Sequence, residues 1–289
     1  MGDNPPVAMD ETHLEEVERW RAHRLARLQS ADGWLAVVGL AWLQQGENSV
    51  GSDPLSGVAL PAGGAPGRVG SIEVRGERAI MHPDPAAGLI HRGETLTEPL
   101  ELRGDETGDP TIVRIGTVSF YVIRRLGGLA VRIKDAAAPA IAAFGGIAHY
   151  PVDVRWRVRA RLEPYEPPRW AEVPTVMETP ERYRVPGALA FEIDGVAHRL
   201  EAFLEEGETD LFVVFGDLTN RTETFGGGRY IYTDPPDERG VVVLDFNRAY
   251  NPPCVFTAHA TCPLPLPQNR MSIRVEAGEK RYADSEKPG

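Results

Sequence analysis

The stretch LAFEIDGVAHRLEAF, residues 189–203, decides the fold class most directly. Two apolar-rich runs, Leu189–Ile193 and Ala197–Phe203, flank the dipeptide Asp194-Gly195. An Asp-Gly pair between such runs is a strong signal for a β-hairpin, because its backbone tolerates the positive φ angles of a tight turn. The stretch therefore predicts two antiparallel strands.

Further β-prone runs surround this hairpin in the second half of the chain, at Val154–Leu162, Leu211–Phe215, Arg229–Thr233, Val241–Phe246 and Ser272–Val275. No stretch after residue 140 is long enough for a helix that crosses over between parallel strands, which excludes a doubly wound nucleotide-binding fold. We therefore expect residues 151–289 to form an antiparallel β domain.

The first half shows the same pattern of short β-prone runs, separated by Gly, Pro and Asp: Val58–Leu60, Val69–Val74, Ala79–Met81, Thr111–Ile115, Val118–Ile123 and Leu129–Ile133. Runs at this spacing are typical of a β-sandwich or small barrel, so residues 46–150 are expected to form a β-sandwich-like domain. A proline-rich stretch, Pro151–Pro186, follows and favours a domain boundary, although it still offers a strand at Val154–Leu162. An exposed linker and two β parts that share one core are the two alternatives.

Residues 1–45 are expected to be an N-terminal helical segment. Apolar residues recur at helical spacing between Thr12 and Ser30, which predicts one amphipathic helix. The run Trp34–Leu43 fits a short buried helix or a strand equally well. The predicted fold class is thus mainly β, with an N-terminal helical segment followed by two antiparallel β-sandwich or barrel-like units.

Composition limits the partners of this 289-residue chain. A net charge of −11 and an isoelectric point near 5.2 argue against binding to nucleic acid, which requires clustered Lys and Arg. No apolar run approaches the roughly 20 residues of a membrane-spanning helix, so we expect no membrane partner. The N-terminus lacks a basic segment leading into an apolar stretch, and we therefore expect a cytoplasmic protein.

A glycine triplet precedes Arg229 and Tyr230 in the sequence FGGGRY, residues 225–230. Glycines allow the backbone to approach a ligand closely, and an arginine can bind a carboxylate or phosphate through two hydrogen bonds. The pattern is compatible with a cradle for a small anionic ligand. A bulged hairpin with a structural arginine is the alternative, because the segment lacks the Gly-Lys-Ser/Thr ending of a phosphate-binding loop.

A second polar group follows the apolar run Val241–Phe246. Asp245 and Asn247 share one face of an extended strand, and Tyr250 and Asn251 come directly after it. Such groups at strand ends often contact ligands, although an Asp near an Arg is as often a structural ion pair. The predicted ligand-binding residues are Arg229, Tyr230, Asp245, Asn247, Tyr250 and Asn251.

Two cysteines, Cys254 and Cys262, enclose seven residues that include His259. These three residues are candidates for a reactive or metal-binding site, although they fall short of a four-ligand zinc set and lack a Cys-x-x-Cys pair. Buried and inert thiols are the alternative. The cofactor requirement is unknown from the sequence.

The same C-terminal segments carry a family resemblance. They are FGGGRY (225–230), LDFNRAYNPPC (244–254), CPLP (262–265), QNR (268–270) and GEK (278–280), with Tyr150-Pro151 and Gly33-Trp34-Leu35 upstream. The chain resembles the bacterial family described as domain of unknown function 1684, and the likeness is expected to extend over nearly the whole chain. The resemblance implies no activity, cofactor or catalytic residue.

Two hypotheses of function follow. In the first, the C-terminal domain binds a small polar or anionic molecule, with or without turnover, in a pocket lined by the six residues named above. In the second, these segments close the β domain as a structural clasp, and the protein is a structural or protein-interaction module without catalytic activity.

Overall fold

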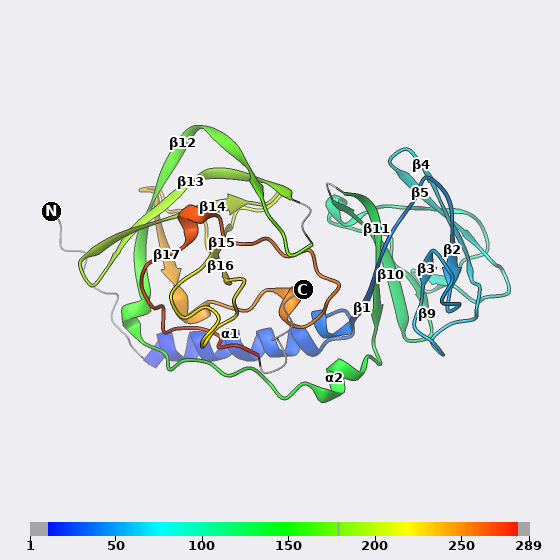
Figure 1. Cartoon of the computed structure of the whole chain (residues 1–289), viewed down its shortest axis with the longest axis horizontal. Coiled ribbons are helices and arrows are strands. Elements are labelled where there is room, and N and C mark those ends of the chain that lie inside the picture. The colour runs from blue at the N-terminus through cyan, green and yellow to red at the C-terminus, as the bar shows by residue number, and fades with distance from the viewer. Residues whose placement is uncertain (1–10, 126, 178–179, 283–289) are drawn as a thin grey trace. The chain divides into compact units, whose positions relative to one another are not determined.

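The computed structural model describes residues 11–125, 127–177 and 180–282 (Figure 1). The chain divides into two compact units. We call residues 26–144 and 257–260 the N-terminal unit, and residues 1–25, 145–256 and 261–289 the C-terminal unit. The predicted domain limits at residues 45 and 150 remain a prediction. In the described part of the chain, no helix combines the length and apolar character needed to cross a membrane.

The fold is mainly β, as the sequence predicts. Helix α1 (Glu11–Gln29) confirms the predicted N-terminal helix, and its Val17 and Leu28 are buried. The run Trp34–Leu43, which fitted either a helix or a strand, follows α1 and contains both. A 3-10 turn, η1 (Trp34–Ala36), leads into strand β1 (Val37–Trp42).

The N-terminal unit contains two sheets around one apolar core. The first has the order β1, β11 (Gly128–Asp135), β10 (Val118–Arg125), β9 (Val113–Ile115), β6 (Ile90–His91) and β7 (Glu94–Thr95). The second has the order β3 (Val58–Ala59), β2 (Gly46–Gly51), β4 (Gly70–Arg75), β5 (Arg78–Pro83) and β8 (Leu100–Leu102). All pairs are antiparallel except β2 with β3. A one-turn helix, α2 (Pro139–Ala143), follows β11, and a 3-10 turn, η2 (Asp105–Thr107), follows β8.

The C-terminal unit contains one antiparallel sheet of six strands. Their order is β16 (Arg229–Thr233), β15 (Leu211–Phe215), β14 (Val196–Leu204), β13 (Glu181–Ile193), β12 (Arg157–Val173) and β17 (Val241–Asp245). Asp194 and Gly195 connect β13 to β14 with φ angles of 52° and 75°, so the predicted hairpin turn is confirmed. The strands curve around a core of large apolar side chains that includes Trp156, Phe191, Phe215 and Phe246.

The proline-rich stretch is not a linker. It forms most of β12 and the start of β13, which pair as a long antiparallel hairpin (Figure 1). The pairing is interrupted between Pro164 and Arg169, so the prolines there occupy positions where no ladder hydrogen bond is made. A β-bulge accommodates residues that lack an N–H donor. A high density of prolines therefore does not exclude a strand.

The final segment, residues 246–282, contains no strand among its described residues. The run Ser272–Val275, predicted as a strand, is irregular. Three short 3-10 turns occur instead, η4 (Phe246–Arg248), η5 (Pro253–Val255) and η6 (Pro267–Asn269). A backbone without hydrogen bonds to a neighbouring strand needs other hydrogen-bond partners. Side chains of the candidate site supply several of them.

Candidate functional site

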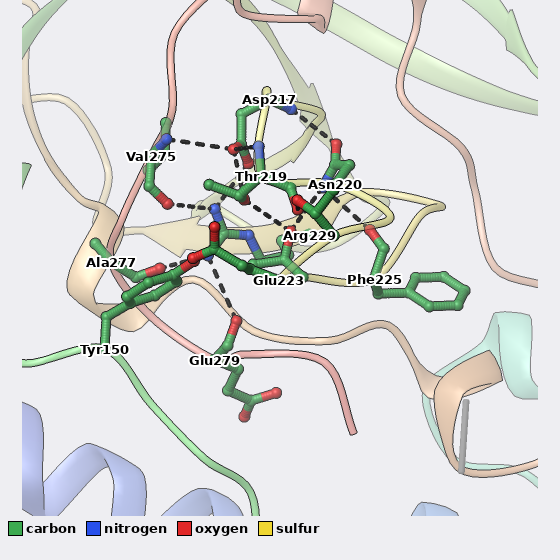
Figure 2. A network of polar contacts seen from close by, with 12 residues as sticks. Tyr150, Asp217, Thr219, Asn220, Glu223, Phe225, Arg229, Val275, Ala277 and Glu279 are labelled. Carbon is green, nitrogen blue, oxygen red and sulfur yellow. Dashed lines mark hydrogen bonds and ion pairs between the residues drawn. The ribbon is translucent and has the colours of Figure 1, made fainter. Parts of the chain in front are cut away.

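Arg229, the central residue of the predicted anion cradle, is fully buried at the start of β16. Its guanidinium donates to carbonyl oxygens of the irregular C-terminal segment, at Val275 (2.8 Å), Ala277 and Glu279 (3.5 Å). Its second terminal nitrogen donates to Oδ2 of Asp217 at 2.8 Å (Figure 2). The donors expected to hold an anion therefore bind the protein itself.

Asp217 completes this buried network from the loop after β15. Its Oδ1 accepts hydrogen bonds from the N–H and the hydroxyl of Thr219, at 2.7 and 2.6 Å. The N–H of Val275 donates to the same oxygen at 3.2 Å. The side chains of Arg229 and Asp217 are both 0% exposed, so this is an ion pair in a low-dielectric interior.

Within the glycine triplet, Gly228 allows the backbone to pack closely against its neighbours. This residue has a φ of 88°, and a Cβ atom there would lie 2.5 Å from both the carbonyl oxygen of Phe215 and the ring of Pro265. The close approach that glycine allows is thus to neighbouring protein backbone, and it brings Arg229 into register with Phe215 in β15.

Asp245, at the end of β17, pairs with helix α1 and not with Arg229. Its Oδ2 lies 2.9 Å from Nε2 of the fully buried His13. Its Oδ1 accepts from the N–H and side-chain amide of Asn247, at 3.0 and 2.8 Å. The amide of Asn247 also exchanges hydrogen bonds with the backbone of Asp153, at 3.0 Å each.

Asn251 and Glu279 form a third buried group. The carboxylate of Glu279 accepts from the N–H of Asn251 at 2.7 Å and from Nε of Arg24 at 2.6 Å. Arg24 also donates to the carbonyl of Asn251 at 2.8 Å, and the side-chain amide of Asn251 donates to the carbonyl of Lys280 at 2.9 Å. These contacts attach α1 and the C-terminal segment to the same turn.

Cys254 and Cys262 lie together as free thiols. The N–H of Cys254 donates to Sγ of Cys262 at 3.1 Å. A hydrogen bond with Cys262, followed by burial, raises the pKa of the Cys254 thiol. His259 belongs to the N-terminal unit, and burial lowers its pKa. Among the described residues, no group of three or more His, Cys, Asp or Glu side chains could hold a metal ion.

Tyr230 and Tyr250 belong to a continuous run of aromatic rings. Tyr250 contacts Trp20 and Tyr230 at centroid distances of 6.2 and 5.8 Å. Tyr230 contacts Phe212 edge-on at 5.0 Å, and Phe212 stacks on Tyr232 at 4.7 Å. We call these five residues the aromatic run.

Polar groups accompany the aromatic run at both ends. The guanidinium of Arg24 lies 4.3 Å from the ring centre of Tyr250. The hydroxyl of Tyr232 donates to Glu205 at 2.7 Å, and that of Tyr230 to the carbonyl of Pro263 at 2.7 Å. Burial raises the pKa of Tyr230 and Tyr250, so both remain neutral phenols at physiological pH.

The structure separates the six predicted ligand-binding residues into two sets. Arg229, Asp245, Asn247 and Asn251 are at most 6% exposed and bind other parts of the chain. Tyr230 and Tyr250 belong to the aromatic run, of which Tyr232 is 43% exposed while Trp20 and Tyr250 are half-buried.

Sequence reasoning missed several partners of these residues: His13, Arg24, Asp217 and Tyr232. His13 lies 232 residues from Asp245, and Arg24 lies 255 residues from Glu279. No local pattern relates positions so far apart. The alternation of Tyr230 and Tyr232 along β16 was the one available signal, since residues two apart share a face of a strand.

These features define a mainly β protein whose C-terminal motifs fasten an irregular segment to an antiparallel sheet. The chain belongs to the family described as "Protein of unknown function (DUF1684)", whose profile matches residues 142–280. The match begins after Gly33-Trp34-Leu35, so the expected likeness over nearly the whole chain is not borne out in that region.

One solved structure similar to this chain is the solution NMR structure of an uncharacterised protein from Haloarcula marismortui. The two sequences are 32% identical over 48% of this chain and 78% of that one, with a TM-score of 0.42. No curated protein matches the chain.

Proposed function

We propose that the C-terminal unit binds a small polar molecule at the accessible side of the aromatic run. The observation that carries this proposal is the exposure of Tyr232, which is 43% accessible although it stacks on the buried Phe212. An ordered, accessible aromatic face offers apolar contact area at a low cost in side-chain entropy. Buried aromatic rings behind it hold this face in place.

The neighbouring groups indicate which molecules would fit. Glu205 already accepts a hydrogen bond from Tyr232 and has further acceptor capacity for a hydroxyl or ammonium group. The ring of Tyr232 can pack against a planar ring or the apolar face of a sugar. We therefore favour a hydroxylated or amine-bearing molecule with one flat, apolar face.

An anionic ligand has less support than a neutral or cationic one. Arg229 was the cation predicted to bind it, but this side chain is fully buried and four hydrogen bonds occupy its terminal nitrogens. Arg24 is the other nearby cation, and its charge is paired with Glu279. Turnover of the ligand is not part of the proposal.

A second function, that of a structural or protein-interaction module without catalytic activity, is favoured by a different observation. Four of the six predicted ligand contacts act within the chain. In that case the exposed aromatic surface contacts another protein and not a small molecule. The same residues would then form part of a much larger contact area. On composition alone, we further propose a cytoplasmic location with neither nucleic acid nor membrane as partner.

A binding screen tests the proposal. The wild-type protein is titrated with monosaccharides, nucleosides and aromatic amines while tryptophan fluorescence and melting temperature are recorded, with Trp20 as a reporter beside Tyr250. We expect at least one class to bind, Tyr232→Ala to weaken its binding about tenfold or more, and the melting temperature of the free variant to stay close to wild type.

Tyr121→Ala is the matched control, because Tyr121 is likewise a tyrosine in a strand, but it is half-buried, lies beside Lys134 and belongs to the N-terminal unit. Equal binding by wild type and Tyr232→Ala would exclude this surface as the binding site. If no class binds but the protein captures a partner whose binding depends on Tyr232, the interaction module would be the better account.

A further inference from the structure

We propose that Cys254 and Cys262 form an intramolecular disulfide when the protein meets a small disulfide oxidant such as oxidised glutathione. The two residues are the only cysteines of the chain. The backbone N–H of Cys254 donates to Sγ of Cys262 at 3.1 Å. The structure thus brings together the two groups that the reaction must join.

A metal is a weaker use of the same pair. Stable zinc sites usually require four protein ligands, or three and a water. No group of three or more suitable side chains occurs among the residues that the structure describes. A disulfide, in contrast, requires only two adjacent thiols.

Accessibility sets the order of the two steps. Cys254 is half-buried, whereas Cys262 is 4% exposed. Cys254 therefore meets the oxidant first. Its thiolate attacks oxidised glutathione, which forms a mixed disulfide and releases one reduced glutathione. The Cys262 thiolate then attacks the Cys254 sulfur, forms the Cys254–Cys262 bond and releases the second reduced glutathione, so two electrons and two protons pass from the protein to glutathione.

The bond would close a short segment that links the two units. The chain leaves the C-terminal unit after Phe256 and re-enters it at Thr261, and residues 257–260 belong to the N-terminal unit. There the hydroxyl of Thr257 donates to the carbonyl of Val37 at 2.9 Å. A disulfide would join the two ends of this segment and restrict its conformational freedom in the unfolded chain.

The reaction should be slow at neutral pH. Only the thiolate attacks a disulfide, and the hydrogen bond and burial that raise the pKa of Cys254 keep this group protonated. The thiolate fraction of a group well below its pKa rises about tenfold per pH unit. We therefore expect the oxidation rate to continue rising above pH 9, where an ordinary exposed cysteine levels off.

The test uses the full-length, fully reduced protein incubated with oxidised glutathione between pH 7 and 10. Aliquots are quenched with acid, alkylated in denaturant and weighed by mass spectrometry. We expect the monomer to lose two hydrogens, to resist alkylation and to melt several degrees higher than the reduced protein. Hydrogen exchange at residues 257–260 should slow on oxidation.

Cys254→Ser and Cys262→Ser are the matched variants, and each should stop at a mixed disulfide with glutathione or stay reduced. If Cys262→Ser fails to fold, Cys254→Ser at the half-buried position supplies the comparison. Glutathione adducts or disulfide-linked dimers as the main wild-type products would overturn the proposal. It would equally be overturned if the native protein remained a dithiol at pH 10 while the denatured chain oxidised.

Discussion

Gly278 illustrates how single residues of the motifs act on the backbone. It has a φ of 74°, and a Cβ atom there would lie 2.4 Å from the carbonyl oxygen of Ala249. The same carbonyl accepts the N–H of Glu279 at 2.8 Å. Glycine is therefore required both for the left-handed conformation and for the space that lets Glu279 reach its partners.

We expect Gly278→Ala to destabilise the protein considerably more than Gly240→Ala. Gly240 has the same φ of 74°, but the nearest atom to an added Cβ would be 3.8 Å away. Gly240→Ala should cost about 1–2 kcal/mol for its left-handed backbone alone, while Gly278→Ala adds a clash with backbone. Urea unfolding of the two variants measures the difference. Equal losses would mean that the packing around Gly278 yields easily.

At this scale the sequence singled out charged and polar residues of the C-terminal segments but not the side chains that they contact. Arg229 and Asp245 stood out as charged residues in a polar segment, and both are involved in buried networks. Their partners, Asp217 and His13, come from other elements, and only the folded chain determines which charges meet. Residue type indicates that a buried charge needs a partner but not which partner it has.

Among the elements, the β12–β13 hairpin departs most from expectation. Its residues were predicted to contain a domain boundary, with one strand at Val154–Leu162, because prolines usually interrupt strands. In the structure, Arg169 pairs with Val185 and Glu172 pairs with Arg182, beyond the irregular region that contains the prolines. The tyrosine and arginine side chains of β12 also pack together, with Arg169 located 4.9 Å from the ring centre of Tyr165.

Limited proteolysis with trypsin tests this assignment. Trypsin cleaves after Lys and Arg, and the sites at Arg169, Arg182 and Arg184 all lie in paired strands. We expect them to resist cleavage, because a protease must accommodate an unpaired, extended backbone. Arg68 is the control site, since it precedes β4 outside any strand and its side chain is 69% exposed. Cleavage at Arg169 or Arg182 before Arg68 would restore the linker interpretation.

The strands themselves followed from local pattern to a large degree. The runs Leu211–Phe215 and Arg229–Thr233 match β15 and β16 residue for residue. The hairpin turn at Asp194-Gly195 was equally clear, since its chemistry is local. The irregular run Ser272–Val275 was not, because β-prone composition cannot show that the Arg229 side chain binds the backbone carbonyl of Val275.

Over the whole molecule, side chains from distant segments hold the C-terminal unit together. Helix α1 contributes His13 and Arg24, which bind Asp245 and Glu279 respectively. Arg229 binds three carbonyls of residues 275–279. The central claim of this account follows: the polar motif residues fasten the irregular segment to the sheet, and we propose that a ligand binds at the aromatic run instead.

Equilibrium urea unfolding of wild type, Arg229→Met, Asp217→Asn and the double variant tests this claim most directly. Hydrogen exchange of residues 211–233 and 271–282 locates the unfolding in the C-terminal unit. Arg229→Met should cost about 3–5 kcal/mol, because it leaves the buried Asp217 carboxylate without its cation. The double variant should recover part of that loss, since its asparagine carries no charge. The account would be contradicted if Arg229→Met were as stable as wild type and if hydrogen exchange were no faster in either segment. Arg229 would then again be a candidate ligand contact.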